Sequence, residues 1–228
     1  MPRLIAALLR HGDYRQLPET PSALQPFPLT EMGREQSRSV AGTLLQMARE
    51  MRCSIDTELH SSHQLRAWES ASLIAENLQG DYTVQSFDAL AERSMGSAAN
   101  LTVSQVEAVV REDPRFEELP ADWKSSSHFC LPLQGAESLA EAGQRVAQHL
   151  VKTMRHLAQH VQQDTLKVFV GHGAAMRHAA WHIGVLDLAD VARLSMFHAQ
   201  PVCLEYSDAG WQHVGGDWKV RDATAPPD

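Results

Sequence analysis

The sequence has few cysteines and no surplus of positive charge, and each shortage argues against a class of function. Cys53, Cys130 and Cys203 lie far apart and form no Cys-x-x-Cys pair, so neither a zinc cage nor a dense disulfide framework is indicated. This cysteine usage fits a reducing cytoplasm, which we expect as the location. The formal net charge of -8 argues against nucleic acid and anionic membranes as partners, because surfaces that gather them need an excess of Lys and Arg.

Long apolar runs are also missing from the sequence. The opening apolar run, residues 4–9, ends at Arg10 and is too short for a secretory or membrane-spanning segment. The chain has 228 residues, of which 43% are hydrophobic, and it contains no long linker rich in Pro and Gly. We therefore predict a single domain over residues 1–228 with one sizeable core.

Strand and helix patterns alternate along the chain. The runs at residues 4–9 and 168–170 are continuously apolar, as in strands that are covered on both faces. Further strands are predicted over residues 55–60, 82–87, 202–206 and 211–214, and helices over residues 30–51, 64–78, 137–162 and 174–183. The alternation predicts an α/β fold, a three-layer sandwich with a mostly parallel central sheet flanked by helices.

Residues 112–134 differ from the rest of the chain. Three Xaa-Pro pairs interrupt any helix there, and a serine run adds loop composition, so we predict a lid-like insertion. Trp123, Lys124, His128 and Phe129 within it are candidates for contact with the leaving group of a substrate. Trp123 and Phe129 have a second option, which is to anchor the insertion against the core.

Two predicted strands each lead into a His-Gly pair, at His11-Gly12 and at His172-Gly173. Parallel strands place both pairs at the carboxyl edge of one sheet, where open α/β folds bind ligands. Glycine lets a ligand approach closely, and we expect the helix that begins near Gly173 to offer unpaired backbone amides to an anion. With Arg10 beside them, the two imidazoles predict a phosphate site.

Five sequence motifs then occur in the order found in a known family. They are Leu9-Arg10-His11-Gly12, Leu29-Thr30-x-x-Gly33-x-x-Gln36, Ser61-Ser62-x-x-Leu65-Arg66-Ala67, Glu92-Arg93-x-x-Gly96 and Gly171-His172-Gly173. A single Arg-His-Gly triplet is weak support for a family, whereas an ordered set is strong. The set resembles the histidine phosphatase superfamily, in its phosphoglycerate mutase-like branch.

The resemblance implies a role for each matched side chain. His11 is the expected nucleophile that forms a covalent phosphohistidine, and Glu92 is the expected proton donor. Arg10, Arg66 and His172 are expected to bind the phosphate, with His172 also catalytic. The chemistry agrees, because a neutral imidazole can attack phosphorus in line and guanidinium groups match phosphoryl oxygens. No metal and no other cofactor are expected.

Three further residues are candidates for substrate binding: Arg177, Arg15 and Gly173. Arg177 follows His172 by five residues, so it could reach the substrate or brace the phosphate pocket. A position on the helix surface is equally plausible for an arginine.

The sequence departs from the glycolytic mutases that it resembles. Asp13-Tyr14-Arg15 follows the first motif where those enzymes carry Glu-Ser and then Trp-Asn. Residues 112–134 contain isolated Arg115 and Lys124, where mutases hold the substrate carboxylate with adjacent arginines.

These differences favour a metal-independent phosphatase that hydrolyses a phosphomonoester of a small metabolite. The alternatives are a phosphoglycerate mutase, a protein phosphohistidine or phosphotyrosine phosphatase, and a regulatory binding protein that keeps the pocket but works through a partner. The expected partner is a small phosphorylated substrate, and a homodimer is left open.

Overall fold

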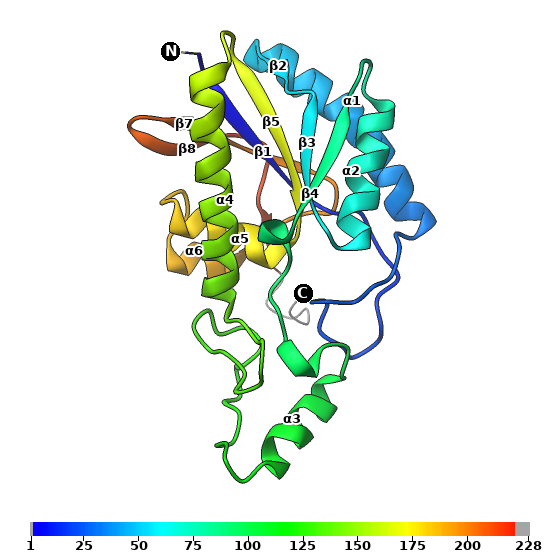
Figure 1. Ribbon diagram of the computed structural model, residues 1–228, viewed down its shortest axis with the longest axis vertical. Helices are drawn as coiled ribbons and strands as arrows, with labels where there is room; N and C mark the ends of the chain where they lie inside the picture. Colours follow the sequence, from blue (N-terminus) through cyan, green and yellow to red (C-terminus); the bar gives the residue numbers. More distant parts are fainter. Residues whose placement is uncertain (1, 222–228) are drawn as a thin grey trace.

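The computed structural model describes residues 2–221, which form an α/β fold around a mixed sheet (Figure 1). In sheet order the strands are β4 (Thr83–Phe87), β3 (Glu58–Ser62), β5 (Thr165–Gly171), β1 (Leu4–Arg10), β7 (Pro201–Ser207) and β8 (Gly210–Gly215). The pairings from β4 to β1 are parallel, and those of β7 with its two neighbours are antiparallel. The predicted mostly parallel sheet is therefore confirmed.

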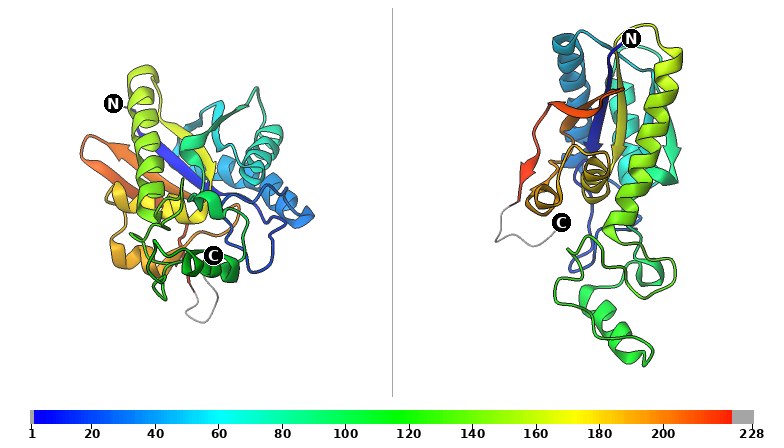
Figure 2. Two further views of the ribbon diagram at one scale, coloured as in Figure 1. Left: turned by 60° about the horizontal axis from the view of Figure 1, so that its bottom comes forward. Right: turned by 90° about the vertical axis from the view of Figure 1, so that its left-hand side faces the viewer.

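Helices cover both faces of this sheet, as Figures 1 and 2 show. On one face lie α1 (Glu31–Met51) and α2 (Leu65–Asn77), and on the other lie α4 (Leu139–His160) and α5 (Gly173–His182). Within the described residues, no helix is both long and apolar enough to cross a bilayer. The predicted three-layer sandwich is present.

The apolar run of β1 is continuous because both of its faces are buried. Successive side chains on a strand point to opposite faces. Ile5, Ala7 and Leu9 pack with α1 and α2, whereas Leu4, Ala6 and Leu8 pack with α4 and α5. Strand β1 therefore lies in the centre of the molecule, and it delivers the residue that follows it to the middle of the sheet edge.

The strand predicted over residues 55–60 is instead two strands, β2 (Ser54–Ile55) and β3. Between them the chain turns so that Asp56 faces Lys167, whose side chain on β5 is only 3% exposed. The Asp56 carboxylate lies 3.0 Å from the Lys167 ammonium. A buried ammonium needs such a partner. The carboxylate that meets this need, Asp56, lies between β2 and β3 and interrupts their apolar pattern.

Several short elements were not predicted from the sequence. They are the 3-10 turns η1 (Asp88–Leu90) and η2 (Gly96–Ala98), the helices α3 (Val103–Glu112) and α6 (Leu188–Arg193), and the strand pair β6 (Leu194–Ser195) and β9 (Lys219–Val220). Helix α3 lies at the end of the molecule farthest from α1 and α4 (Figures 1 and 2).

The segment that leads away from the sheet is longer than the predicted insertion 112–134, because β4 ends at Phe87 and α4 begins only at Leu139. We call residues 94–138 the lid. Trp123 is 2% exposed and packs in a small separate core with Met95 and Val106, and its indole donates a hydrogen bond to Glu107. Of the two options for Trp123, the structure shows the anchor.

Close packing of α4 on α5 gives a testable prediction. A methyl group added to Gly143 on α4 would lie 2.3 Å from the Cβ atom of His178 on α5. Gly143→Ala is expected to lower the free energy of unfolding by about 1–3 kcal/mol, because overpacking forces the helices apart. Gly42→Ala on α1 is the matched control, since nothing lies within 4 Å of its added methyl group.

The control is expected to leave stability unchanged or raise it by about 0.5–1 kcal/mol, since Ala favours helix over Gly. Denaturant unfolding of the two variants beside the wild type checks both values. Equal shifts would contradict the close approach of α4 and α5.

Candidate active site

The second motif holds the loop that follows β1. A Cβ atom on Gly12 would lie 2.4 Å from the carbonyl oxygen of Gly33, so only glycine fits there. The Thr30 hydroxyl caps α1 by accepting the Gly33 amide and donates to the Asp13 carboxylate at 2.6 Å. The Gln36 side chain accepts the Asp13 amide at 2.8 Å. The Leu-Thr-x-x-Gly-x-x-Gln motif is therefore a scaffold for the first histidine.

His11 is buried at the carboxyl end of β1, with its backbone amide bonded to the Gly171 carbonyl at the end of β5. Its Nδ1 lies 2.7 Å from the Gly12 carbonyl oxygen, which can only accept, so Nδ1 carries the proton. Its Nε2 accepts a hydrogen bond from Arg66 Nε at 3.0 Å. Burial, followed by the charges of Arg66 and Arg10, holds the pKa of His11 well below 6.5. The ring is therefore neutral and has its lone pair on Nε2.

Arg66 is a fully buried cation. Its guanidinium donates to the carbonyls of Ala23 and Gln25 at 2.8 and 2.9 Å and lies over the Tyr14 ring at 4.6 Å. Among residues 2–221, no carboxylate lies within ion-pair distance of it. Burial lowers its pKa, and the charge of Glu92 opposes this only in part; a buried charge without an ion-pair partner is costly. The site is therefore suited to bind an anion.

His172 lies beside His11, with 5.2 Å between the ring centroids. Its Nδ1 faces Arg66 Nη2 at 3.2 Å and must accept from it, so Nε2 carries the proton toward the Ser62 hydroxyl at 3.0 Å. Burial and then the charge of Arg66 hold its pKa well below 6.5. The Nε2–H donor of His172 is thus bonded to Ser62 in this structure. The role of His172 in binding phosphate stays a prediction.

Glu92 caps the helix that follows His172. Its Oε1 accepts the amides of Arg93 and Ala175 at 2.9 and 3.1 Å, and its Oε2 accepts the amide of Ala174 at 3.3 Å. A negative charge is favourable at a helix N-terminus. We expected unpaired amides near Gly173, and this expectation was wrong for Ala174 and Ala175, because the Glu92 carboxylate already occupies them.

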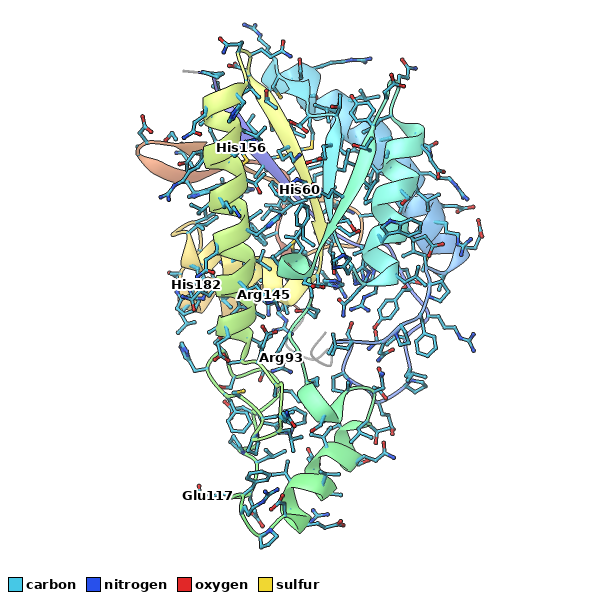
Figure 3. All side chains as sticks on the ribbon, in the orientation of Figure 1. His60, Arg93, Glu117, Arg145, His156 and His182 are labelled. Carbon is cyan, nitrogen blue, oxygen red and sulfur yellow. The ribbon has the colours of Figure 1, made fainter. Side chains whose placement is uncertain are left out.

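A cavity opens above these groups, between the sheet edge and the lid. Among residues 2–221, the charged side chains that line it are basic apart from one carboxylate. The lining residues are Arg10, His11, Pro21, Ser22, Ala23, Glu92, Arg93, Lys124, Ser125, Leu139, Gly173, Ala174, Arg177 and Arg221. Arg66 and His172 do not line the cavity, and they contact the ring of His11, which does line it. Figure 3 labels Arg93, which lies between the sheet edge and the lid.

The substrate-binding candidates separate in the structure. Arg177 is 4% exposed, donates to the Leu194 carbonyl at 2.7 Å and lines the cavity, so it is not a surface residue. Gly173 leaves room for the side chain of Arg10, since an added Cβ atom would lie 3.2 Å from the Cδ of Arg10. Arg15 is exposed, lies 5.8 Å from the Phe27 ring and is absent from the cavity lining. The structure therefore does not bring Arg15 to the other candidates.

Sequence reasoning missed some members of the site. Tyr14 is 5% exposed, and its ring lies 5.2 Å from that of His11. Its position directly after the first motif was a signal, but we read that segment only as a departure from the mutases. The His198 ring lies 5.6 Å from the His11 ring, and Arg221 lines the cavity. No motif surrounds either of these two residues.

Comparisons with known proteins bear on the family and on the fold. The model of the histidine phosphatase superfamily (branch 1) matches residues 6–217. No curated protein sequence matches the chain.

Three solved structures resemble the chain over nearly all of its length. A structure described as mycobacterial hydrolase 1 is 20% identical with a TM-score of 0.70, covering 97% of this chain and 99% of that one. A mycobacterial glucosyl-3-phosphoglycerate phosphatase complexed with VO3 is 20% identical with a TM-score of 0.65, covering 97% and 100%. A phosphoglycerate mutase from Bacillus anthracis is 16% identical with a TM-score of 0.71, covering 93% and 92%. At such identities the likeness shows the fold.

The protonation of the two histidines can be measured. Near pH 6 an unperturbed histidine is mostly protonated, but we expect both rings to be neutral, with the proton on Nδ1 of His11 and on Nε2 of His172. The reasons are the lowered pKa values and the hydrogen-bond partners given above. Nitrogen-15 NMR of the imidazoles, assigned with single His→Gln variants, checks both statements. A midpoint of titration at or above pH 6.5 for either ring would contradict them.

Proposed function

Because the chain belongs to the histidine phosphatase superfamily, we propose that it is a metal-independent phosphatase acting on a phosphomonoester of a small metabolite. The observation that carries the proposal is the neutral, buried His11, whose Nε2 lies beside the buried charge of Arg66. An imidazole with a lone pair beside an anion site can attack phosphorus and form a phosphohistidine. Arg66 and Arg10 supply the positive charge that faces the phosphoryl oxygens.

In the structure the Nε–H of Arg66 donates to the Nε2 lone pair of His11. A phosphoryl oxygen carries negative charge and is a stronger acceptor than a neutral imidazole. Substrate binding would therefore draw the guanidinium to the phosphoryl group and release the nucleophile. The Nδ1–H of His11 stays bonded to the Gly12 carbonyl, which stabilises the positive charge that develops on the ring.

In the first step Nε2 of His11 forms a bond to phosphorus while the bond from phosphorus to the leaving oxygen breaks. Glu92, in its protonated form, gives its proton to that oxygen. Its Oε1 already accepts two amides at 2.9 and 3.1 Å, whereas Oε2 accepts one at 3.3 Å. We therefore assign the transferred proton to Oε2.

In the second step water attacks phosphorus as the bond from phosphorus to Nε2 breaks. The Glu92 carboxylate takes a proton from this water. Inorganic phosphate leaves, His11 is neutral again, and Glu92 is again protonated, so the cycle is closed.

Two other activities use the same first step. A mutase returns the phosphoryl group to the substrate, and the solved structures that resemble this chain include both a phosphatase and a mutase. The isolated basic residues of the lid favour the phosphatase over the mutase. Lid residues Lys124 and Ser125 and residues 21–23 bound the cavity, which favours a small substrate over a protein.

The main test is phosphate release in the presence of a chelator. We expect wild-type protein to hydrolyse 4-nitrophenyl phosphate and at least one metabolite from a panel of phosphorylated sugars, glycerates and nucleotides. His11→Ala is expected to lower the rate by about 1,000-fold or more, because the nucleophile is removed. His156→Ala, an exposed histidine on α4, is the control. Activity that disappears with the chelator, or isomerised product without free phosphate, would overturn the proposal.

The charges of the cavity indicate the class of leaving group. The charges of Arg10 and Arg66 balance those of one phosphoryl group. Arg93 and Lys124 add further positive charge to the lining. The chain as a whole has a net charge of -8, so this basic lining is a local arrangement. We infer a leaving group that carries a second negative charge.

Lys124 allows a specific test of that preference. Lys124→Met is expected to lower kcat/KM about tenfold for 3-phosphoglycerate, since a charge-assisted contact is lost. The same change should leave kcat/KM for glycerol 3-phosphate within about twofold, as this substrate lacks the carboxylate. Lys152→Met, on the exposed face of α4, is the matched control. Equal losses on both substrates would contradict a role for Lys124 in binding the second charge.

A further inference from the structure

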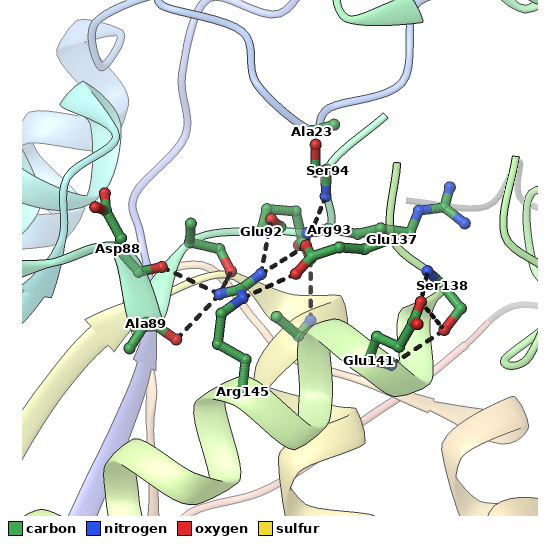
Figure 4. A network of polar contacts seen from close by, with 12 residues as sticks. Ala23, Asp88, Ala89, Glu92, Arg93, Ser94, Glu137, Ser138, Glu141 and Arg145 are labelled. Carbon is green, nitrogen blue, oxygen red and sulfur yellow. Dashed lines mark hydrogen bonds and ion pairs between the residues drawn. The ribbon is translucent and has the colours of Figure 1, made fainter. Parts of the chain in front are cut away.

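The guanidinium of Arg145, on α4, holds the backbone of the segment that carries Glu92. Its Nη1 lies 3.1 Å from each of the carbonyl oxygens of Asp88, Ala89 and Ala91, and its Nη2 lies 3.4 Å from that of Glu92. Figure 4 shows these contacts converging on one side chain. A single arginine therefore contacts nearly every carbonyl of residues 88–92.

The same guanidinium forms an ion pair at the root of the lid. Its Nε and Nη2 donate to the two carboxylate oxygens of Glu137 at 3.0 and 2.8 Å. Glu137 in turn accepts the Ser94 amide at 3.0 Å and donates its own amide to the Ser94 carbonyl at 2.9 Å. Ser94 and Glu137 lie at the two ends of the lid, so Arg145 joins both ends to the Glu92 segment (Figure 4).

Glu92 is thereby fixed from three directions. Its carbonyl faces Arg145, its amide donates to the Gln64 side chain at 3.3 Å, and its carboxylate lies on the first amides of α5. Proton transfer to a leaving group requires the carboxyl oxygen to be within hydrogen-bond reach of it. We propose that Arg145, paired with Glu137, is a positioning residue for proton transfer by Glu92. This inference rests on the phosphatase activity proposed above.

The partial exposure of the Arg145–Glu137 ion pair separates a role in positioning Glu92 from a role in stabilising the core. The side chains of Arg145 and Glu137 are 26% and 25% exposed. A partly exposed ion pair contributes little to global stability, and water can solvate the carbonyls if the guanidinium is removed. Loss of the contact would therefore release the Glu92 segment while the protein stays folded.

Two substitutions separate the geometry of the side chain from its charge. Arg145→Lys keeps the positive charge, but one ammonium cannot replace a planar fork that spans four carbonyls and a carboxylate. Glu137→Gln keeps the size of the side chain and its contact with the Ser94 amide, and it removes the ion pair. Both variants should misplace Glu92 without touching His11 or the phosphate side of the cavity.

The experiment measures how strongly the first step depends on the leaving group. A series of substituted phenyl phosphates keeps the substrate shape constant while the basicity of the leaving oxygen changes, and kcat/KM reports the transfer of the phosphoryl group to His11. A well-placed acid protonates the leaving oxygen, so the wild type should depend only weakly on that basicity. For Arg145→Lys we expect a loss of about 10- to 100-fold for phenyl phosphate and a clearly smaller loss for 4-nitrophenyl phosphate.

Two further variants serve as controls. Glu92→Gln sets the slope expected when the acid is absent, and Arg155→Lys makes the same change at an exposed position of α4. Thermal unfolding shows whether each variant is folded, and Glu137→Gln provides the result if Arg145→Lys is not. Equal losses across the phosphate series, or unchanged kinetics, would overturn the positioning role alone. If wild-type protein releases no phosphate that depends on His11, the proposed function and this inference fail together.

Discussion

The buried charge of Arg66 is the constraint on which the rest of the site depends. A buried guanidinium must direct its donors to something, and here the acceptors are the carbonyls of residues 22–25 and the two imidazoles. These acceptors come from segments that are far apart in the chain. Arg66 therefore holds these segments together, and its positive charge fits the site for an anion.

The sheet explains how two distant histidines meet. Strands β1 and β5 are parallel neighbours in register, with Arg10 opposite Gly171, so the residue after each strand emerges at the same edge. The sequence predicted this much, because both strands are apolar on two faces and the motif residues follow them. It also predicted the cap at Thr30, since a threonine before an amphipathic run is a local signal.

The parts that could not be predicted depend on contacts without a side-chain pattern. Arg145 resembles any polar residue of an amphipathic helix, because most of its partners are backbone carbonyls, which leave no trace in the sequence. Helix α3 buries few side chains, Val106 and Val110 among them, too few for a clear helical period. The break between β2 and β3 follows from one buried charge, Lys167, whose burial is a tertiary property.

The hydrogen bond from Arg66 to Nε2 of His11 also has a consequence for selectivity. This bond engages the only lone pair of the imidazole, so the nucleophile is masked from neutral electrophiles that enter the cavity. A molecule must first compete for the guanidinium, which an anion does and an uncharged ester or alkylating agent does not. Discrimination against uncharged reagents is therefore built into this hydrogen bond, before any group of the leaving alcohol has been recognised.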